Sequence, residues 1–138
     1  MFPRTLLRTS LTTLLTAPRF QPALRRAMAT TTTPTQEWLV IVPDFPAVLE
    51  KRLAVRGNHL QGLLADPEHF WQFGGAMLEE PIKEGETPKM KGSAMLCVAA
   101  TEAEVVERLR RDVYVTSGVW DIEKIQVIPF KSAVRKAL

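Results

Sequence analysis

The sequence predicts an α+β domain with a four-stranded antiparallel sheet and two helices on one face. Two observations support this class. Residues 37–138 contain four apolar segments with the length and β-branched content of strands, and two longer segments with helical periodicity. The order of these segments is βαββαβ, which places a helix after the first strand and another after the third.

The sequence of the first half of the domain predicts a strand and a long helix. Residues 38–42 form an apolar run that ends at Pro43. Asp44 is a suitable helix N-cap, with Pro46 just inside the first turn, and the helix is expected to reach about Leu64. The leucines that recur at helical spacing are expected to form its core face: Leu49, Leu53, Leu60 and Leu64.

The sequence of the second half of the domain predicts three strands and a second helix. The Gly74-Gly75 pair indicates a bulge or a close backbone approach within the second strand, and the Thr101–Glu104 pair has the form of a capping box at the start of the second helix. The expected elements are a strand at 70–78, an exposed loop at 79–91, a strand at 92–100, a helix from 101 to about 111, a turn or short helix at 112–118 and a strand at 120–130.

The strand composition also predicts how the sheet is covered. In the ferredoxin-like arrangement the first and third strands are central, and here both are apolar on both faces. Two helices cover only one face, so a second copy of the sheet is the expected cover of the other. We therefore expect a homodimer joined through the open sheet face, with Val40 among the residues on that face.

The first 36 residues differ in composition from the rest. They contain five arginines and no acidic residue, which is typical of a mitochondrial transit peptide, and they end in a threonine-rich disordered linker at 30–36. We expect a mitochondrial protein whose folded domain spans 37–138. Met28 offers an internal start for a second, cytosolic form.

Charge and motif content argue against several classes of protein. The formal charge is +3, but residues 37–138 hold 13 basic and 15 acidic side chains, so the domain has no basic excess for nucleic acid. No apolar run approaches the ~20 residues of a membrane span. The single cysteine, Cys97, is expected to be a buried strand residue, and no glycine-rich phosphate loop is present.

The long helix carries the candidate chemistry. Arg52, Arg56 and His59 lie at positions i, i+4 and i+7 and share one stripe beside the leucines. The arginines are suited to holding an anionic substrate, and a histidine beside two cations is suited to acting as a general base. The other histidine, His69, is interpreted as a solvated loop residue, so no metal site is expected.

These residues resemble those of the YciI-like (YCII-related) family, within the dimeric α+β barrel group. The similar segments are Glu50-Lys51-Arg52 with Arg56 and His59-Leu60, Asp112-Val113-Tyr114, Gly118-Val119 and Pro129-Phe130-Lys131. The resemblance covers about residues 37–135 and implies that His59 and Asp112 form an acid–base pair. Val113 stands where the family usually has proline, which leaves the Asp112 turn less rigid.

Two functions fit this resemblance. The first is a cofactor-free lyase or isomerase in which His59 and Asp112 transfer a proton on a small anionic or phenolic substrate, with Arg52, Arg56 and Tyr114 binding it. The alternative is a non-catalytic dimeric module that binds small molecules or serves in stress. A cavity lined by His59, Arg56, Asp112 and Tyr114 would favour the enzyme.

Overall fold

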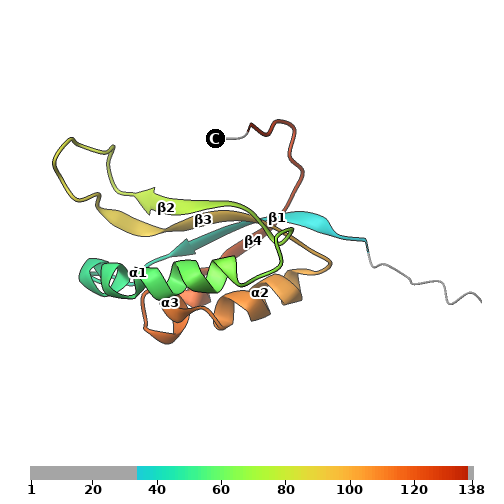
Figure 1. The fold of residues 1–138 in the computed structure, drawn as a ribbon, viewed down its shortest axis with the longest axis horizontal. Coiled ribbons are helices and arrows are strands. Elements are labelled where there is room, and N and C mark those ends of the chain that lie inside the picture. Colours follow the sequence, from blue (N-terminus) through green and yellow to red (C-terminus); the bar gives the residue numbers. More distant parts are fainter. Residues whose placement is uncertain (1–33, 137–138) are drawn as a thin grey trace, which may run out of the picture. The chain divides into compact units, whose positions relative to one another are not determined.

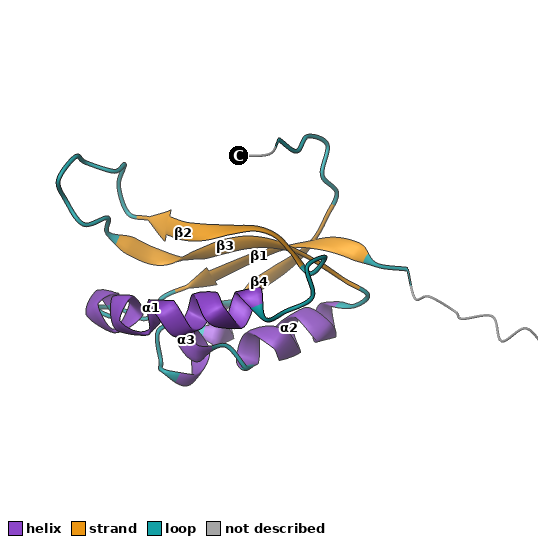
Figure 2. Ribbon diagram, viewed as in Figure 1, coloured by secondary structure: helices purple, strands orange, loops and turns teal. Residues whose placement is uncertain are grey.

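The computed structural model describes residues 34–136, which form the expected α+β domain (Figure 1). Helices cover one face of a four-stranded sheet, as Figure 2 shows by secondary structure. The first strand begins at Gln36, a residue that the sequence assigned to the linker. The transit peptide predicted within residues 1–36 lies outside the described residues apart from 34–36, so it stays a prediction.

The elements follow the predicted order. The last strand is shorter than predicted, because the chain first makes a 3-10 turn after Trp120, and the turn or short helix expected at 112–118 is a separate short helix after the second helix. Their bounds are β1 Gln36–Pro43, α1 Leu49–Leu64, β2 Trp71–Leu78, β3 Met90–Ala99, α2 Glu102–Arg110, α3 Val113–Thr116, η1 Ile122–Lys124 and β4 Gln126–Phe130.

The sheet has the strand order β2-β3-β1-β4, and each of its three strand pairs is antiparallel. The prediction that β1 and β3 are central is confirmed. The strand register places Val40 opposite Met95 and Trp38 opposite Cys97, so these four side chains share the face that the helices cover. All four are nearly inaccessible to solvent and form the core together with residues of α2.

This register corrects one detail of the dimer hypothesis. Val40, expected on the open face, is fully buried under the helices. Leu39 occupies the opposite face, between Leu96 of β3 and Ile128 of β4. A one-residue change of register in a strand moves a side chain to the other face, which explains why apolar composition alone does not separate the two positions.

The prediction for α1 is wrong at both its start and its core face. Ala47 has a φ of 58°, a left-handed conformation that prevents a helix from running through it, so α1 begins at Leu49 and Asp44 does not cap it. Leu53, Leu60 and Leu64 are exposed in the described chain. The helix buries Arg52 and His59 instead, because Asp44 and Ser93 bind Arg52 and Asp112 binds His59.

Cys97 provides a test of the packing in the sheet. Its thiol is fully buried in β3, and burial raises its pKa to about 12. Because only the thiolate reacts rapidly, we expect no labelling by iodoacetamide at neutral pH in the folded protein, and rapid labelling after unfolding in guanidinium chloride. The measurement is intact mass against time, with Cys97→Ala as the blank. Labelling of the folded protein at the rate of the unfolded chain would contradict this packing.

Candidate functional site

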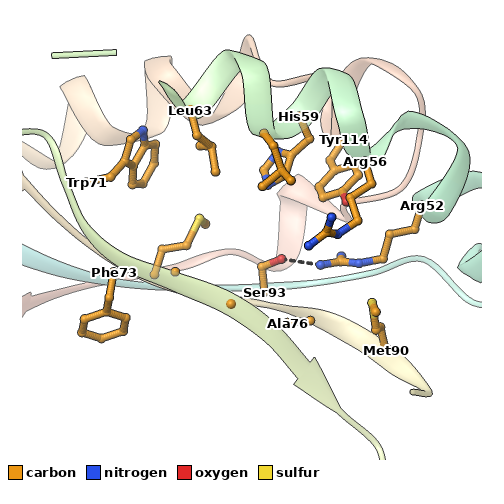
Figure 3. A pocket seen from close by; sticks show the side chains of 14 residues that line it. Arg52, Arg56, His59, Leu63, Trp71, Phe73, Ala76, Met90, Ser93 and Tyr114 are labelled. Carbon is orange, nitrogen blue, oxygen red and sulfur yellow. Dashed lines mark hydrogen bonds between the residues drawn. The ribbon is translucent and has the colours of Figure 1, made fainter. Parts of the chain in front are cut away.

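A cavity of about 220 Å³ lies between α1 and the strands β2 and β3. Figure 3 shows the helix on one side, with Arg56 and His59 directed toward the strands on the other. Its lining includes both arginines of α1, the candidate histidine, and the tyrosine of α3. The residues are Arg52, Arg56, His59, Leu60, Leu63, Trp71, Phe73, Gly74, Gly75, Ala76, Met90, Ser93, Met95 and Tyr114.

His59 is held by a buried carboxylate. Its Nδ1 lies 2.8 Å from Oδ1 of Asp112, and both side chains are less than a tenth exposed. Oδ1 also accepts a hydrogen bond of 2.9 Å from the backbone N–H of Tyr114, so Asp112 caps α3 while it holds the imidazole. Because a carboxylate only accepts hydrogen bonds, this contact places the proton of a neutral imidazole on Nδ1 and its lone pair on Nε2.

Two aromatic rings fix the orientation of the imidazole. The ring of Tyr114 stacks on His59 with a centroid distance of 4.0 Å and an interplanar angle of 19°. Trp120 meets the imidazole edge-on at 5.3 Å. With Nδ1 bound to Asp112, these contacts restrict rotation about both side-chain torsions of His59. The histidine is therefore positioned before any ligand enters.

Asp112 is in turn held by an ion-pair chain that reaches the cavity wall. Arg108 of α2 lies 3.5 Å from the second oxygen of Asp112, and its Nε donates to both oxygens of Asp66 at 2.6 and 2.8 Å. Asp66 also accepts from the indole N–H of Trp71 at 2.7 Å. Arg108 thus connects the cavity residues Trp71 and His59 through their carboxylate partners.

The two arginines of the cavity have different surroundings. Arg52 is buried and donates to Asp44 at 2.7 Å and to the hydroxyl of Ser93 at 2.8 Å. Its guanidinium also lies over the Tyr114 ring, 4.7 Å from the centroid. Arg56 is exposed on the cavity side and makes no ion pair or side-chain hydrogen bond with residues 34–136. Arg52 is therefore balanced by Asp44, whereas Arg56 is available to an anion.

Burial changes the titration of two groups beside the cavity. It raises the pKa of Tyr114, an effect that Arg52 and Arg56 partly offset. The phenol consequently stays protonated at neutral pH and serves as a hydrogen-bond donor. Burial also raises the pKa of Asp44, with partial compensation from its ion pair with Arg52.

The structure brings most of the predicted site residues to one place. His59, Arg52, Arg56 and Tyr114 line the cavity, while Asp112 lies behind His59 rather than on the cavity surface. Sequence reasoning missed Asp44 and Ser93 as partners of Arg52, and Arg108 as a partner of Asp112. The position of Arg108 four residues before Asp112 was the one available signal. Trp71 of β2 is also part of the cavity wall.

Neither a metal-ligand cluster nor a membrane-spanning helix occurs in the described part of the chain. Among residues 34–136, no three His, Cys, Asp or Glu side chains are grouped closely enough to hold a metal ion. None of the helices described is both long and apolar enough to cross a bilayer. His69, expected in a loop, is exposed in the segment before β2.

The fold and the His59–Asp112 cavity define a small α+β domain of the YciI-like kind. Residues 37–131 match the YCII-related domain, and the chain belongs to this family. A solved structure similar in fold is 5-chloro-2-hydroxyhydroquinone dehydrochlorinase (TftG) from Burkholderia phenoliruptrix AC1100, in complex with 2,5-dihydroxybenzoquinone. It is 23% identical, has a TM-score of 0.60, and the match covers 69% of this chain and 93% of that chain.

Two relatives are proteins named for a biosynthesis. The Aspercryptin biosynthesis cluster protein B of Emericella nidulans is 33% identical over 135 residues, which cover 96% of this chain and 85% of the relative. Fusaric acid biosynthesis protein 2 of Gibberella fujikuroi is 36% identical over 99 residues, which cover 70% of this chain and 94% of the relative. The similarity therefore extends along nearly the whole of each relative.

Proposed function

We propose that this protein is a cofactor-free lyase or isomerase that transfers a proton on a small anionic or phenolic substrate. The observation that carries the proposal is the imidazole of His59, whose Nδ1 is held by Asp112 while the residue lines a cavity. A base with its lone pair fixed toward a ligand site is the arrangement that proton transfer requires. The positions of Arg56 and Tyr114 on the same cavity support it.

In the proposed reaction, Nε2 of His59 accepts a proton from a carbon or hydroxyl of the substrate. The electron pair left behind moves toward a carbonyl oxygen or expels a leaving group. The hydroxyl of Tyr114 donates to the oxygen on which charge develops, and Asp112 stabilises the imidazolium. Return of the proton to another substrate atom completes an isomerisation, and its release to solvent completes an elimination.

The similar proteins support a chemistry of this kind without fixing it. TftG is a dehydrochlorinase whose structure contains a dihydroxybenzoquinone, and loss of hydrogen chloride is an elimination. The two relatives are named for the biosynthesis of aspercryptin and of fusaric acid. Loss of hydrogen chloride and movement of a double bond both need one base and one hydrogen-bond donor.

The test is a substrate screen without any added cofactor. The purified full-length protein is incubated in D₂O with unsaturated lactones and chlorinated dihydroxybenzenes, and mass spectrometry detects deuterium incorporation or chloride loss. Enzyme-dependent change in at least one compound is the expected result. If the protein binds members of the panel tightly but changes none of them, the non-catalytic binding module becomes the better hypothesis.

We also propose a homodimer joined through the open sheet face. A row of apolar side chains crosses all four strands there, formed by Phe73, Leu96, Leu39 and Ile128. Phe73 is 54% exposed and Ile128 is 39% exposed, so a single copy leaves part of this row in water.

The C-terminal segment runs on the same side of the sheet (Figure 1), where Ser132 and Arg135 bind Glu37 at one end of β1.

Replacing Leu39 with aspartate should convert the dimer to a monomer. The new carboxylate would lie in the middle of the apolar row, where it would lose its hydration on association. Sedimentation equilibrium measures the mass, and Ala54→Asp, which adds the same charge on the exposed side of α1, is the control. A wild-type protein that sediments as a monomer at high micromolar concentration would refute the dimer.

A further inference from the structure

The cavity beside His59 has two unlike walls. The α1 wall carries long side chains, including Arg56 and His59, which reach across the cavity (Figure 3). The β2 wall is formed by the sequence Gly74-Gly75-Ala76 and carries almost no side-chain atoms. The register pairs Gly74 with Met95 and Ala76 with Ser93, so positions 74 and 76 face the cavity and position 75 faces the open side of the sheet.

This wall is formed by strand backbone and by the side chain of Met95. A Cβ at position 74 would lie 3.1 Å from Cγ of Met95, so the strand backbone rests against that side chain with no room between them. A Cβ at position 75 would meet nothing within 4 Å. Positions 74 and 76 therefore present to the cavity only strand backbone and the single methyl group of Ala76.

The charged side chains of the lining all have the same sign. The lining includes Arg52 and Arg56 but no carboxylate. Arg56 makes no ion pair or side-chain hydrogen bond with residues 34–136, so the cavity presents a charged donor and no competing anion. An acidic ligand group would bind this guanidinium and balance its charge. Leu63, Trp71 and Met95 make the remaining surface apolar.

The volume restricts the ligand to a small molecule. About 220 Å³ lies below the ~300–1,000 Å³ of pockets that hold drug-sized ligands. A nucleotide or a long acyl chain would not fit inside, whereas one six-membered ring with a few substituents would. A flat ring makes the most contact with a wall that has no projecting side chains, because a puckered ring touches such a wall at only a few atoms.

We propose that the substrate is a single planar ring bearing one acidic group, and that Ala76, with Gly74 beside it, selects for planarity. This inference rests on the proposed function, since it names the substrate class of the same site. In the proposed pose the ring lies against Gly74 and Ala76, and its acidic group binds Arg56. The atom that reacts then faces Nε2 of His59.

The test compares three probes that differ in one property each. Calorimetric titration of the full-length protein uses 2-hydroxybenzoate, its uncharged methyl ester, and 2-hydroxycyclohexanecarboxylate, which keeps the charge and the hydroxyl group but is not planar. We expect 2-hydroxybenzoate to bind at least ~10-fold more tightly than either of the others. Equal affinity for 2-hydroxycyclohexanecarboxylate, or no binding of 2-hydroxybenzoate, would overturn the proposal.

Substitutions at position 76 test the role of the wall. Ala76→Val should weaken 2-hydroxybenzoate binding at least ~10-fold, since two methyl groups would project into the ring position while valine still suits a strand. Ala76→Gly should reduce the difference in binding affinity between planar and non-planar acids. Ala54→Val, outside the cavity, should change neither affinity. Unchanged binding by Ala76→Val in a folded protein would refute the assignment.

The binding measurements separate this inference from the proposed function. His59→Gln should retain the planar preference, because the wall and Arg56 are unchanged. Planar selectivity in a protein without turnover would refute only the proton-transfer function. Turnover of non-planar acids through His59 would refute only the planar-ring inference.

Discussion

Replacing His59 with glutamine should lower turnover by about 10²–10⁴-fold, the usual contribution of a positioned acid–base group. Glutamine has a similar length and its side-chain amide can still donate to Asp112, so the cavity should keep its shape. It cannot accept and release a proton at neutral pH, so the chemical step loses its base. The measurement is the rate of deuterium incorporation or chloride loss for the substrate found in the screen.

His69→Gln is the matched control, because it makes the same substitution at an exposed histidine outside the cavity. It should leave both turnover and melting temperature unchanged. His59 is only 7% exposed and stacks on Tyr114, so its replacement should also lower the free energy of unfolding by about 1–2 kcal/mol. A His59→Gln protein with wild-type turnover would end the proposal that this residue is the base.

Asp112→Ala should lower the free energy of unfolding by about 3–5 kcal/mol, the usual cost of removing one member of a buried ion pair. The Asp112 side chain is 2% exposed and serves three partners. Its loss would free Nδ1 of His59, leave Arg108 with only Asp66, and remove the cap of α3 at Tyr114. Urea denaturation monitored by tryptophan fluorescence measures the change.

Asp112→Asn separates capping from charge. The amide oxygen can still accept from Tyr114 and from His59, so this variant should recover part of the stability lost by Asp112→Ala. It should not recover turnover, because a neutral amide stabilises the imidazolium far less than a carboxylate does. Glu107→Gln, which removes a charge from the exposed face of α2, is the control. If Asp112→Ala were as stable as the wild type, the network around Asp112 would have no structural role.

The sequence-based prediction of the core face of α1 was wrong because polar side chains of this helix are buried by specific partners. Periodicity assigned the leucines of α1 to the core, because apolar residues at helical spacing usually face inward. In the structure α1 directs Arg52 and His59 inward, and their burial is possible only because Asp44, Ser93 and Asp112 approach from other elements. No local pattern reveals partners that are 8, 41 and 53 residues away.

The sequence by itself determined the order of the elements, the central position of β1 and β3, and the capping of α2 by Thr101, whose hydroxyl accepts from the N–H of Glu104. These features follow from periodicities of two or 3.6 residues and from local hydrogen bonds, so neighbouring residues are enough to specify them. The resemblance added His59 and Asp112 as a candidate pair.

Only the tertiary structure decided which arginine is available and what forms the wall opposite His59. Arg52 and Arg56 look equivalent on one helical stripe, but Asp44 neutralises only Arg52. Gly74 and Ala76 form the cavity wall opposite His59 only because β2 pairs with β3 and passes beneath α1. Charge balance and cavity shape depend on distances between elements remote in sequence, and those distances are set by packing.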